Sequence, residues 1–133
     1  MSKPFNISEA ASIAIHAMAL IAGSPENLNA VQLSLMTGFS KNHIAKIMGL
    51  LTRSQFLVSE RGPKGGFVLK RNAETLSLLE IYEAIEGVID EQPCGEQCDL
   101  CIARGCVFGG LSVKFTKDFK HYLTMKKLSD FIN

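Results

Sequence analysis

The chain has 133 residues, 47% of them hydrophobic and 20% charged, which suits one folded domain and is shorter than most two-domain enzymes. This composition excludes a wholly disordered chain. The formal net charge of +1 conceals an uneven distribution, because residues 1–71 carry eight basic and three acidic side chains, whereas residues 72–106 carry one basic and eight acidic.

The apolar runs of the chain are too short to cross a membrane. The longest extends from Ala10 to Ala22, is interrupted by Ser12 and His16, and falls short of the ~18–20 residues that a membrane helix needs. A signal peptide is disfavoured because Glu9 lies in the flank of this run. We therefore expect a cytoplasmic protein with no membrane partner.

The first predicted helix begins after Ser8, a typical N-cap, and ends near Ala22, where Gly23 and Pro25 stop it. Apolar residues lie on almost every side of this helix. Such helices are usually enclosed by other elements. We expect it to lie within the core or in a subunit contact.

Two further helices are predicted close together. The first runs from Leu28 to Met36 and stops at Gly38, and the second is capped by Ser40 and continues to about Ser54. The second has a predicted buried stripe at helical spacing, formed by Ile44, Ile47, Met48 and Leu51. Its opposite face carries Asn42, Lys46, Gly49 and Arg53. This pair is typical of a helix-turn-helix, and an ordinary helical hairpin is the alternative.

A β-hairpin is predicted next. Its strands are Phe56 to Glu60 and Phe67 to Arg71, and Gly62 and Gly66 bound the turn. Four basic side chains lie on or beside the turn: Arg61, Lys64, Lys70 and Arg71. A helix-turn-helix followed by a basic hairpin predicts a winged helix, with the third helix in the major groove and the wing on the phosphate backbone. The alternative is a solvated surface hairpin.

Two more helices complete the predicted fold. One spans Ser77 to Glu86, with Ser77 and Glu80 spaced as a capping box and Gly87 as its stop. The last runs from about Cys106 to Leu123, and Thr124 is placed to cap a short closing helix. The last long helix carries an aromatic stripe at helical spacing, formed by Phe108, Leu111, Phe115, Phe119 and Tyr122. Such a stripe commonly lies in a core, and here we interpret it as the surface of a dimerisation helix.

All four cysteines lie within thirteen residues, at Cys94, Cys98, Cys101 and Cys106. Clustered thiols in a cytoplasmic chain usually bind a metal, and soft thiolates suit iron–sulfur clusters and zinc. Zinc is a competitor because Cys98-x-x-Cys101 is the usual half of a structural zinc site. A reactive thiol switch is disfavoured by the acidic neighbours, Asp90, Glu91, Glu96 and Asp99.

Enzymatic activity finds little support. The glycines from Gly62 to Gly66 lie between two strands rather than before a helix, so they do not form a phosphate-binding loop. No arrangement of a nucleophile with a histidine base is legible. We expect neither catalysis nor a small-molecule substrate.

The chain resembles the IscR/NsrR-type (Rrf-type) iron–sulfur winged-helix transcription regulators of bacteria. The resemblance rests on GFSKNHIAKIMGLLTRSQFLV, on ERGPKGGFVLKR, on LSLLEIYEAIEG and on the cysteine segment, which occur in family order and cover nearly the whole chain. SKNHIAKI is especially similar to the nitric-oxide-sensing branch. The resemblance implies a homodimer that binds palindromic promoter DNA and an iron–sulfur cluster that controls its affinity.

The resemblance also implies a ligand set. The three cysteines of the family correspond best to Cys94, Cys101 and Cys106, which leaves Cys98 as an extra thiol. In some relatives the fourth ligand comes from the first helix of the partner subunit, where this chain has Ser12 and His16. Either Cys98 completes the site or His16 of the partner subunit does. Both 2Fe–2S and 4Fe–4S clusters remain compatible with this set.

The sequence as a whole predicts a mostly α fold with a small β-hairpin wing and a long C-terminal dimerisation helix. We expect a winged helix-turn-helix over residues 1–87, a cysteine-rich cluster-binding loop over 88–106, and the dimerisation helix and tail over 107–133, all in one compact domain. The predicted DNA contacts are Ser40, Lys41, Asn42, His43, Lys46, Arg53, Arg61, Lys64, Lys70 and Arg71.

The expected function is a homodimeric repressor or activator of transcription whose cluster senses nitric oxide, redox or iron–sulfur status. The alternative is a zinc-stapled winged-helix module that acts in protein interaction or as a non-sensing DNA binder.

Overall fold

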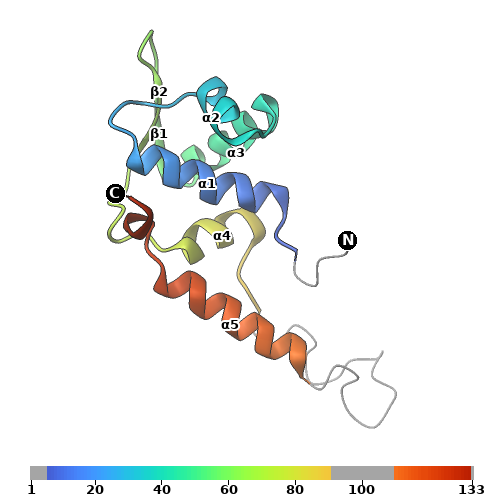
Figure 1. Ribbon diagram of the computed structural model, residues 1–133. Coiled ribbons are helices and arrows are strands. Elements are labelled where there is room, and N and C mark those ends of the chain that lie inside the picture. The colour runs from blue at the N-terminus through green and yellow to red at the C-terminus, as the bar shows by residue number, and fades with distance from the viewer. Residues whose placement is uncertain (1–5, 91–109, 133) are drawn as a thin grey trace.

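The computed structural model describes residues 6–90 and 110–132. Within these ranges the elements in chain order are α1 (Glu9–Gly23), α2 (Ala30–Thr37), α3 (Lys41–Arg53), β1 (Leu57–Glu60), β2 (Gly66–Leu69), α4 (Leu78–Glu86), α5 (Leu111–Met125) and the 3₁₀ helix η1 (Leu128–Phe131). Figure 1 shows the hairpin projecting from the helices at one end and α5 extending at the other. The mostly helical winged-helix fold is confirmed. No helix of the described ranges is long and apolar enough to cross a membrane.

Side-chain caps start the helices where the sequence predicts them. The Ser8 hydroxyl accepts from the Ala11 N–H, and the Ser40 hydroxyl accepts from the His43 N–H, both at 3.1 Å. The capping box of α4 is complete. A cap satisfies backbone donors that the first helical turn leaves free. These short polar signals therefore fix the helix starts locally.

The helix α2 begins at Ala30 rather than at Leu28. Asn29 caps it and exchanges hydrogen bonds of 2.9 Å with Gln32. Leu28 is instead extended and forms an isolated antiparallel bridge with Phe67 of β2. The predicted start was therefore wrong by two residues, because a contact with the distant hairpin holds Leu28 outside the helix.

The core lies around α1, which packs against α2, α3, α4, β2 and η1. This confirms that α1 is an enclosed helix. The predicted stripe of α3 is also confirmed, since Ile44, Ile47, Met48 and Leu51 are only 0–3% exposed. Burying four large side chains on one face fixes which face of α3 remains in solvent.

The wing is a two-stranded antiparallel sheet in which Leu57 pairs with Leu69 and Glu60 pairs with Gly66. Its strands are shorter than predicted. Phe56 precedes β1 and is buried, although its carbonyl still accepts from the Lys70 N–H at 3.0 Å. The basic residues at 70 and 71 therefore follow the paired strand and lie at the base of the wing.

The helix α5 starts later and ends later than predicted. Gly110 has a left-handed backbone with φ 76°, so the helix begins at Leu111 and not at about Cys106. Thr124 lies inside α5 and donates to the Lys120 carbonyl at 2.7 Å, so it does not cap the closing helix. Lys127 occupies the position before η1 instead.

The tail returns to the body of the domain. The Leu128 N–H donates to the Leu76 carbonyl at 2.8 Å, and Leu128 itself is fully buried. The Leu78 N–H donates in turn to the Lys126 carbonyl at 3.0 Å. These bonds fasten the end of α5 beside the start of α4.

Candidate nucleic-acid interface

The outer face of α3 is polar and exposed. Asn42, Lys46 and Arg53 are exposed on the side opposite the buried stripe, and Ser40 and Lys41 are exposed at the start of the helix. The structure thus brings five of the predicted DNA contacts to one surface. A helix with donors and positive charge on its free face can meet base edges and phosphates in a major groove.

His43 has a partner within the protein. Its Nδ1 lies 3.7 Å from Glu9 Oε2, and the side chain is 33% exposed. The contact joins the first turn of α3 to the first turn of α1. His43 therefore lies beside the exposed face of α3 and contacts α1 as well.

The wing carries its basic residues in two groups. Arg61 and Lys64 are exposed in the turn between the strands. At the base, Lys70 Nζ donates to Gln55 Oε1, while Arg71 forms a 3.1 Å ion pair with Glu80 and lies 5.1 Å from the centre of the Phe56 ring. Arg61 and Lys64 are thus exposed in the turn of the wing, whereas Lys70 and Arg71 link its base to neighbouring residues.

Sequence reasoning missed Asn27, which lies in the connector between α1 and α2. Its Nδ2 donates to Glu60 Oε2 at 2.6 Å and to the Lys64 carbonyl at 3.2 Å. An asparagine before a helix is a common turn residue. Nothing in the local pattern indicates a partner more than thirty positions away.

The predicted metal ligands Cys94, Cys98, Cys101 and Cys106 lie outside the described residues. The described residues on either side belong to the end of α4 and the start of α5. Across residues 6–90 and 110–132 there is no group of three or more His, Cys, Asp or Glu side chains that could hold a metal ion. The role of the four cysteines as metal ligands therefore remains a prediction from the sequence.

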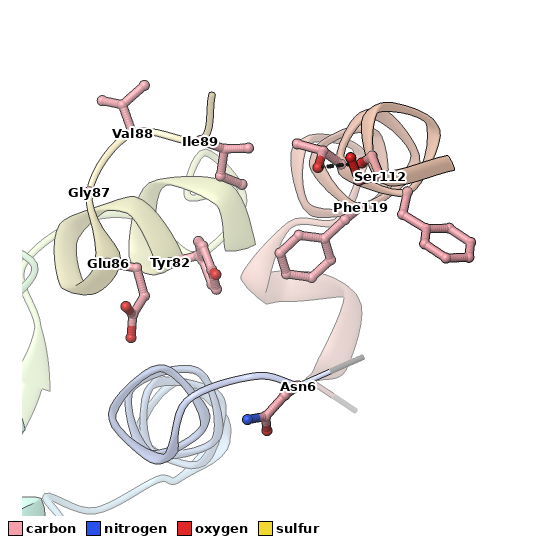
Figure 2. A pocket seen from close by; sticks show the side chains of 10 residues that line it. Asn6, Tyr82, Glu86, Gly87, Val88, Ile89, Ser112 and Phe119 are labelled. Atoms are coloured by element: carbon pink, nitrogen blue, oxygen red, sulfur yellow. Dashed lines mark hydrogen bonds between the residues drawn. The ribbon is translucent and has the colours of Figure 1, made fainter. Parts of the chain in front are cut away.

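A hollow of about 440 Å³ lies between α4 and α5, close to the points where the cysteine segment leaves and returns. Figure 2 shows Tyr82 of α4 on the side of Phe119 of α5, while the Glu86 side chain points toward the N-terminal segment on which Asn6 lies. The rings of Tyr82 and Phe119 meet edge to face at 5.1 Å. Burial, and then the nearby Glu86 carboxylate, raises the pKa of Tyr82. Tyr82 therefore stays a neutral hydroxyl at physiological pH.

His16 lies elsewhere. It is exposed on α1, its Nδ1 lies 2.7 Å from the Ser12 carbonyl, and its ring centre is 6.4 Å from that of Phe39. It borders a separate hollow with Met36 and Phe131. Within one subunit His16 does not line the hollow between α4 and α5.

The predicted aromatic stripe of α5 divides into two parts. Phe119 packs against Tyr82, whereas Leu111, Phe115, Tyr122 and Met125 are 45–63% exposed. At about 100° per residue the exposed four share one face of the helix. Phe108 lies outside the described residues.

Comparison with known proteins places these features in a family. Residues 7–133 match the profile of Rrf2, described as an iron-dependent transcriptional regulator. An HTH-type transcriptional regulator of Neisseria meningitidis is 27% identical over 106 residues, which cover 77% of this chain and 72% of that protein. IscR of Pectobacterium atrosepticum is 27% identical over 96 residues, which cover 68% of this chain and 57% of that protein.

Solved structures share the fold. CymR, the global cysteine regulator of B. subtilis, superposes with a TM-score of 0.76 at 18% identity and covers 95% of both chains. IscR of T. potens superposes with a TM-score of 0.74 at 18% identity, covering 96% of this chain and 85% of that one.

Proposed function

Because the chain belongs to the Rrf2 family of DNA-binding transcriptional regulators, which are not enzymes, we propose that it forms a homodimer whose affinity for promoter DNA is controlled by an iron–sulfur cluster. The observation that carries the proposed DNA binding is the exposed polar face of α3 beside a basic wing. We assign DNA binding to residues 1–87, the cluster to 88–106 and dimerisation to 107–133.

The proposed DNA-binding surface combines contacts to base edges with contacts to the phosphate backbone. Asn42 and Lys46 can reach base edges or phosphates from α3, and Arg53 lies about two turns beyond Lys46 on the same face. Arg61 and Lys64 are placed to contact the phosphate backbone. Ser40, Lys41, His43, Lys70 and Arg71 complete the proposed set. Phosphate contacts fix position on the duplex, whereas base contacts carry sequence preference.

Replacing Lys64 with alanine should weaken binding to all duplexes alike and reduce the slope of log affinity against log salt by about one unit, the contribution of one phosphate contact. Anisotropy titrations over a range of salt concentrations measure this slope. Lys117→Ala is the matched control, because this exposed residue of α5 carries the same charge and lies away from both the proposed DNA surface and the exposed apolar side chains of α5. A slope unchanged in the Lys64 variant would contradict the phosphate contact.

The exposed apolar face of α5 supports dimerisation. Phe115 is 51% and Tyr122 50% exposed on this face. Apolar side chains gathered in this way commonly mark an interaction surface.

Replacing Phe115 with glutamate should convert the dimer to a monomer, because it removes an exposed aromatic ring from the proposed contact and adds a second carboxylate one turn before Asp118, where burial would cost its hydration. Sedimentation measures the mass directly. His121→Glu changes an exposed position of the same helix and should leave the dimer intact. A Phe115 variant that remains dimeric would remove α5 from the interface.

The cysteine segment has the donor chemistry that an iron–sulfur cluster needs. Four thiols lie within thirteen residues, and acidic neighbours favour a centre that supplies its own positive charge. We propose Cys94, Cys101 and Cys106 as ligands and Cys98 as the fourth. His16 of the partner subunit is the alternative fourth ligand. When bound, the cluster would supply a centre that reacts with nitric oxide or oxidants.

The proposed signal passes through contacts of α1. The Ser8 hydroxyl donates to the Glu86 carboxylate at the end of α4, and Glu9 pairs with His43 at the start of α3. A conformational change in the segment that follows α4 can therefore reach α3, the proposed DNA-binding helix, through the first turn of α1. Because SKNHIAKI resembles the nitric-oxide-sensing branch, we propose nitric oxide as the first signal to test, before redox and iron–sulfur status.

A further inference from the structure

The connector between α1 and α2 is fastened to both arms of the wing. The Leu28 carbonyl accepts from the Phe67 N–H of β2 at 2.8 Å. Asn27 Nδ2 donates to the Glu60 carboxylate at the end of β1 and to the Lys64 carbonyl in the turn. Figure 1 shows this connector passing the hairpin on its way to α2. Two adjacent residues thus hold β1, the turn and β2.

One glycine allows this close approach to the connector, and a second allows the tight turn of the wing. A Cβ on Gly66 would lie 2.7 Å from the carbonyl carbon and oxygen of Leu28, and a Cβ on Gly65 would lie 2.5 Å from the Glu60 carbonyl oxygen. Real Cβ atoms essentially never come so close to backbone atoms. The connector therefore lies this close to the wing only with glycine at position 66, and the turn itself closes only with glycine at position 65.

The Asn27 amide is the side-chain link at this contact and the link that reaches the turn. The surrounding space is a hollow of about 360 Å³ bordered by Glu26, Gln32 and Pro63, so the turn is not held by a packed apolar core. Glu60 is also the only acidic residue between positions 57 and 71, where four basic residues lie. Its carboxylate is bound to the connector through Asn27.

We propose that Asn27 is a positioning residue for DNA binding: it holds the wing turn so that Arg61 and Lys64 meet the phosphate backbone at a fixed distance from α3. A two-stranded hairpin is marginally stable by itself. A wing released from the connector must be ordered again on binding, which lowers affinity. This inference rests on the proposed contact between the wing and DNA.

The first test needs no DNA. Trypsin cleaves after Arg61 and Lys64, so the rate of cleavage in the folded protein reports opening of the turn. Asn27→Ala should cleave there about three- to tenfold faster, the effect of one or two lost hydrogen bonds. Asn72→Ala is the matched control, because Asn72 accepts from the Glu74 N–H at the base of the wing and not at its turn. Equal cleavage rates in the two variants would overturn the proposal.

The second test measures binding to a random-sequence duplex of about 30 base pairs, long enough for two half-sites. Asn27→Ala should lower affinity about three- to tenfold and reduce the salt slope by one to two units, since about one unit is lost per phosphate contact. Lys64→Ala separates the proposed contact between the wing and DNA from the proposed positioning role of Asn27. If Lys64→Ala lowers the slope and Asn27→Ala does not, the wing contact stands and the positioning role fails. If neither lowers it, the proposed wing contact itself fails.

A paired exchange guards against a variant that is simply misfolded. Asn27→Asp places a second carboxylate against Glu60, and should open the turn further. Adding Glu60→Gln restores a donor opposite an acceptor and returns the formal charge to that of the wild type. The double variant should therefore cleave more slowly than Asn27→Asp and bind DNA more tightly. A double variant no better than Asn27→Asp in either measurement would show that this side-chain pair does not hold the turn.

Discussion

Replacing Cys101 with serine is expected to remove most of the visible absorption and most of the bound iron and sulfide from protein prepared without oxygen. A serine hydroxyl is not deprotonated at neutral pH and is a harder donor than a thiolate, so it is a poor substitute in a set of four soft ligands. The cysteines at 94 and 106 should behave in the same way. The measurement is an absorption spectrum with iron and sulfide analysis on the same sample.

Two further variants decide the fourth ligand. Cys98→Ser should also lose the cluster, whereas His16→Ala should retain wild-type absorption. The reverse result would replace Cys98 by His16 of the partner subunit and leave the cluster itself in place. A Cys101 variant that retains its full iron and sulfide would contradict the ligand set.

Replacing Gly66 with alanine is expected to lower the free energy of unfolding by about 3 kcal/mol or more. The new Cβ would lie 2.7 Å from backbone atoms of Leu28, and φ at this residue is +154°. Backbone cannot move aside as a flexible side chain can, so overpacking and backbone strain act together. Such a loss is a large fraction of the stability of a typical domain.

Gly62 provides the matched control for this variant. It also has a positive φ, +107°, but a Cβ there would have no atom within 4 Å. Gly62→Ala should therefore cost only about 1 kcal/mol, from strain alone. Denaturant unfolding of both variants gives the comparison. Equal losses would mean that the close approach to Leu28 does not determine the stability of the wing.

Features set by neighbours in the chain could be predicted from the sequence. Ser8, Ser40 and Ser77 start their helices as predicted, because a cap depends on residues only three positions away. The stripe from Ile44 to Leu51 is buried as predicted, because helical periodicity determines which side chains face the core together. The exposed face of α3 follows from the same periodicity.

Features set by distant contacts could not be predicted in this way. Leu28 has an ordinary helical pattern, yet Phe67 of the hairpin binds its carbonyl and keeps it extended. Asn27 finds its partners in the wing, and the start of α5 depends on the left-handed backbone of Gly110. A linear pattern records which side chains are polar or apolar. It does not record which distant backbone will lie beside them.

The uneven charge of the chain agrees with the proposed assignment of DNA binding to one part of the chain and cluster binding to another. The basic part, residues 1–71, includes α3 and the wing, whereas the acidic part, residues 72–106, includes α4 and the cysteine segment. A total of +1 therefore does not argue against DNA binding. The attraction of a nucleic-acid surface depends on local charge, and a dimer would present the basic surface twice.

The central claim is that the state of the cysteine segment controls affinity for DNA. Its most direct test is one anisotropy titration of a duplex selected from a random pool by the protein prepared without oxygen. The same titration is then repeated after removal of the metal centre. We predict affinities that differ by at least about fivefold, the lower end of typical coupling between sites. Equal affinities, or a colourless protein with stoichiometric zinc in place of iron and sulfide, would contradict the account.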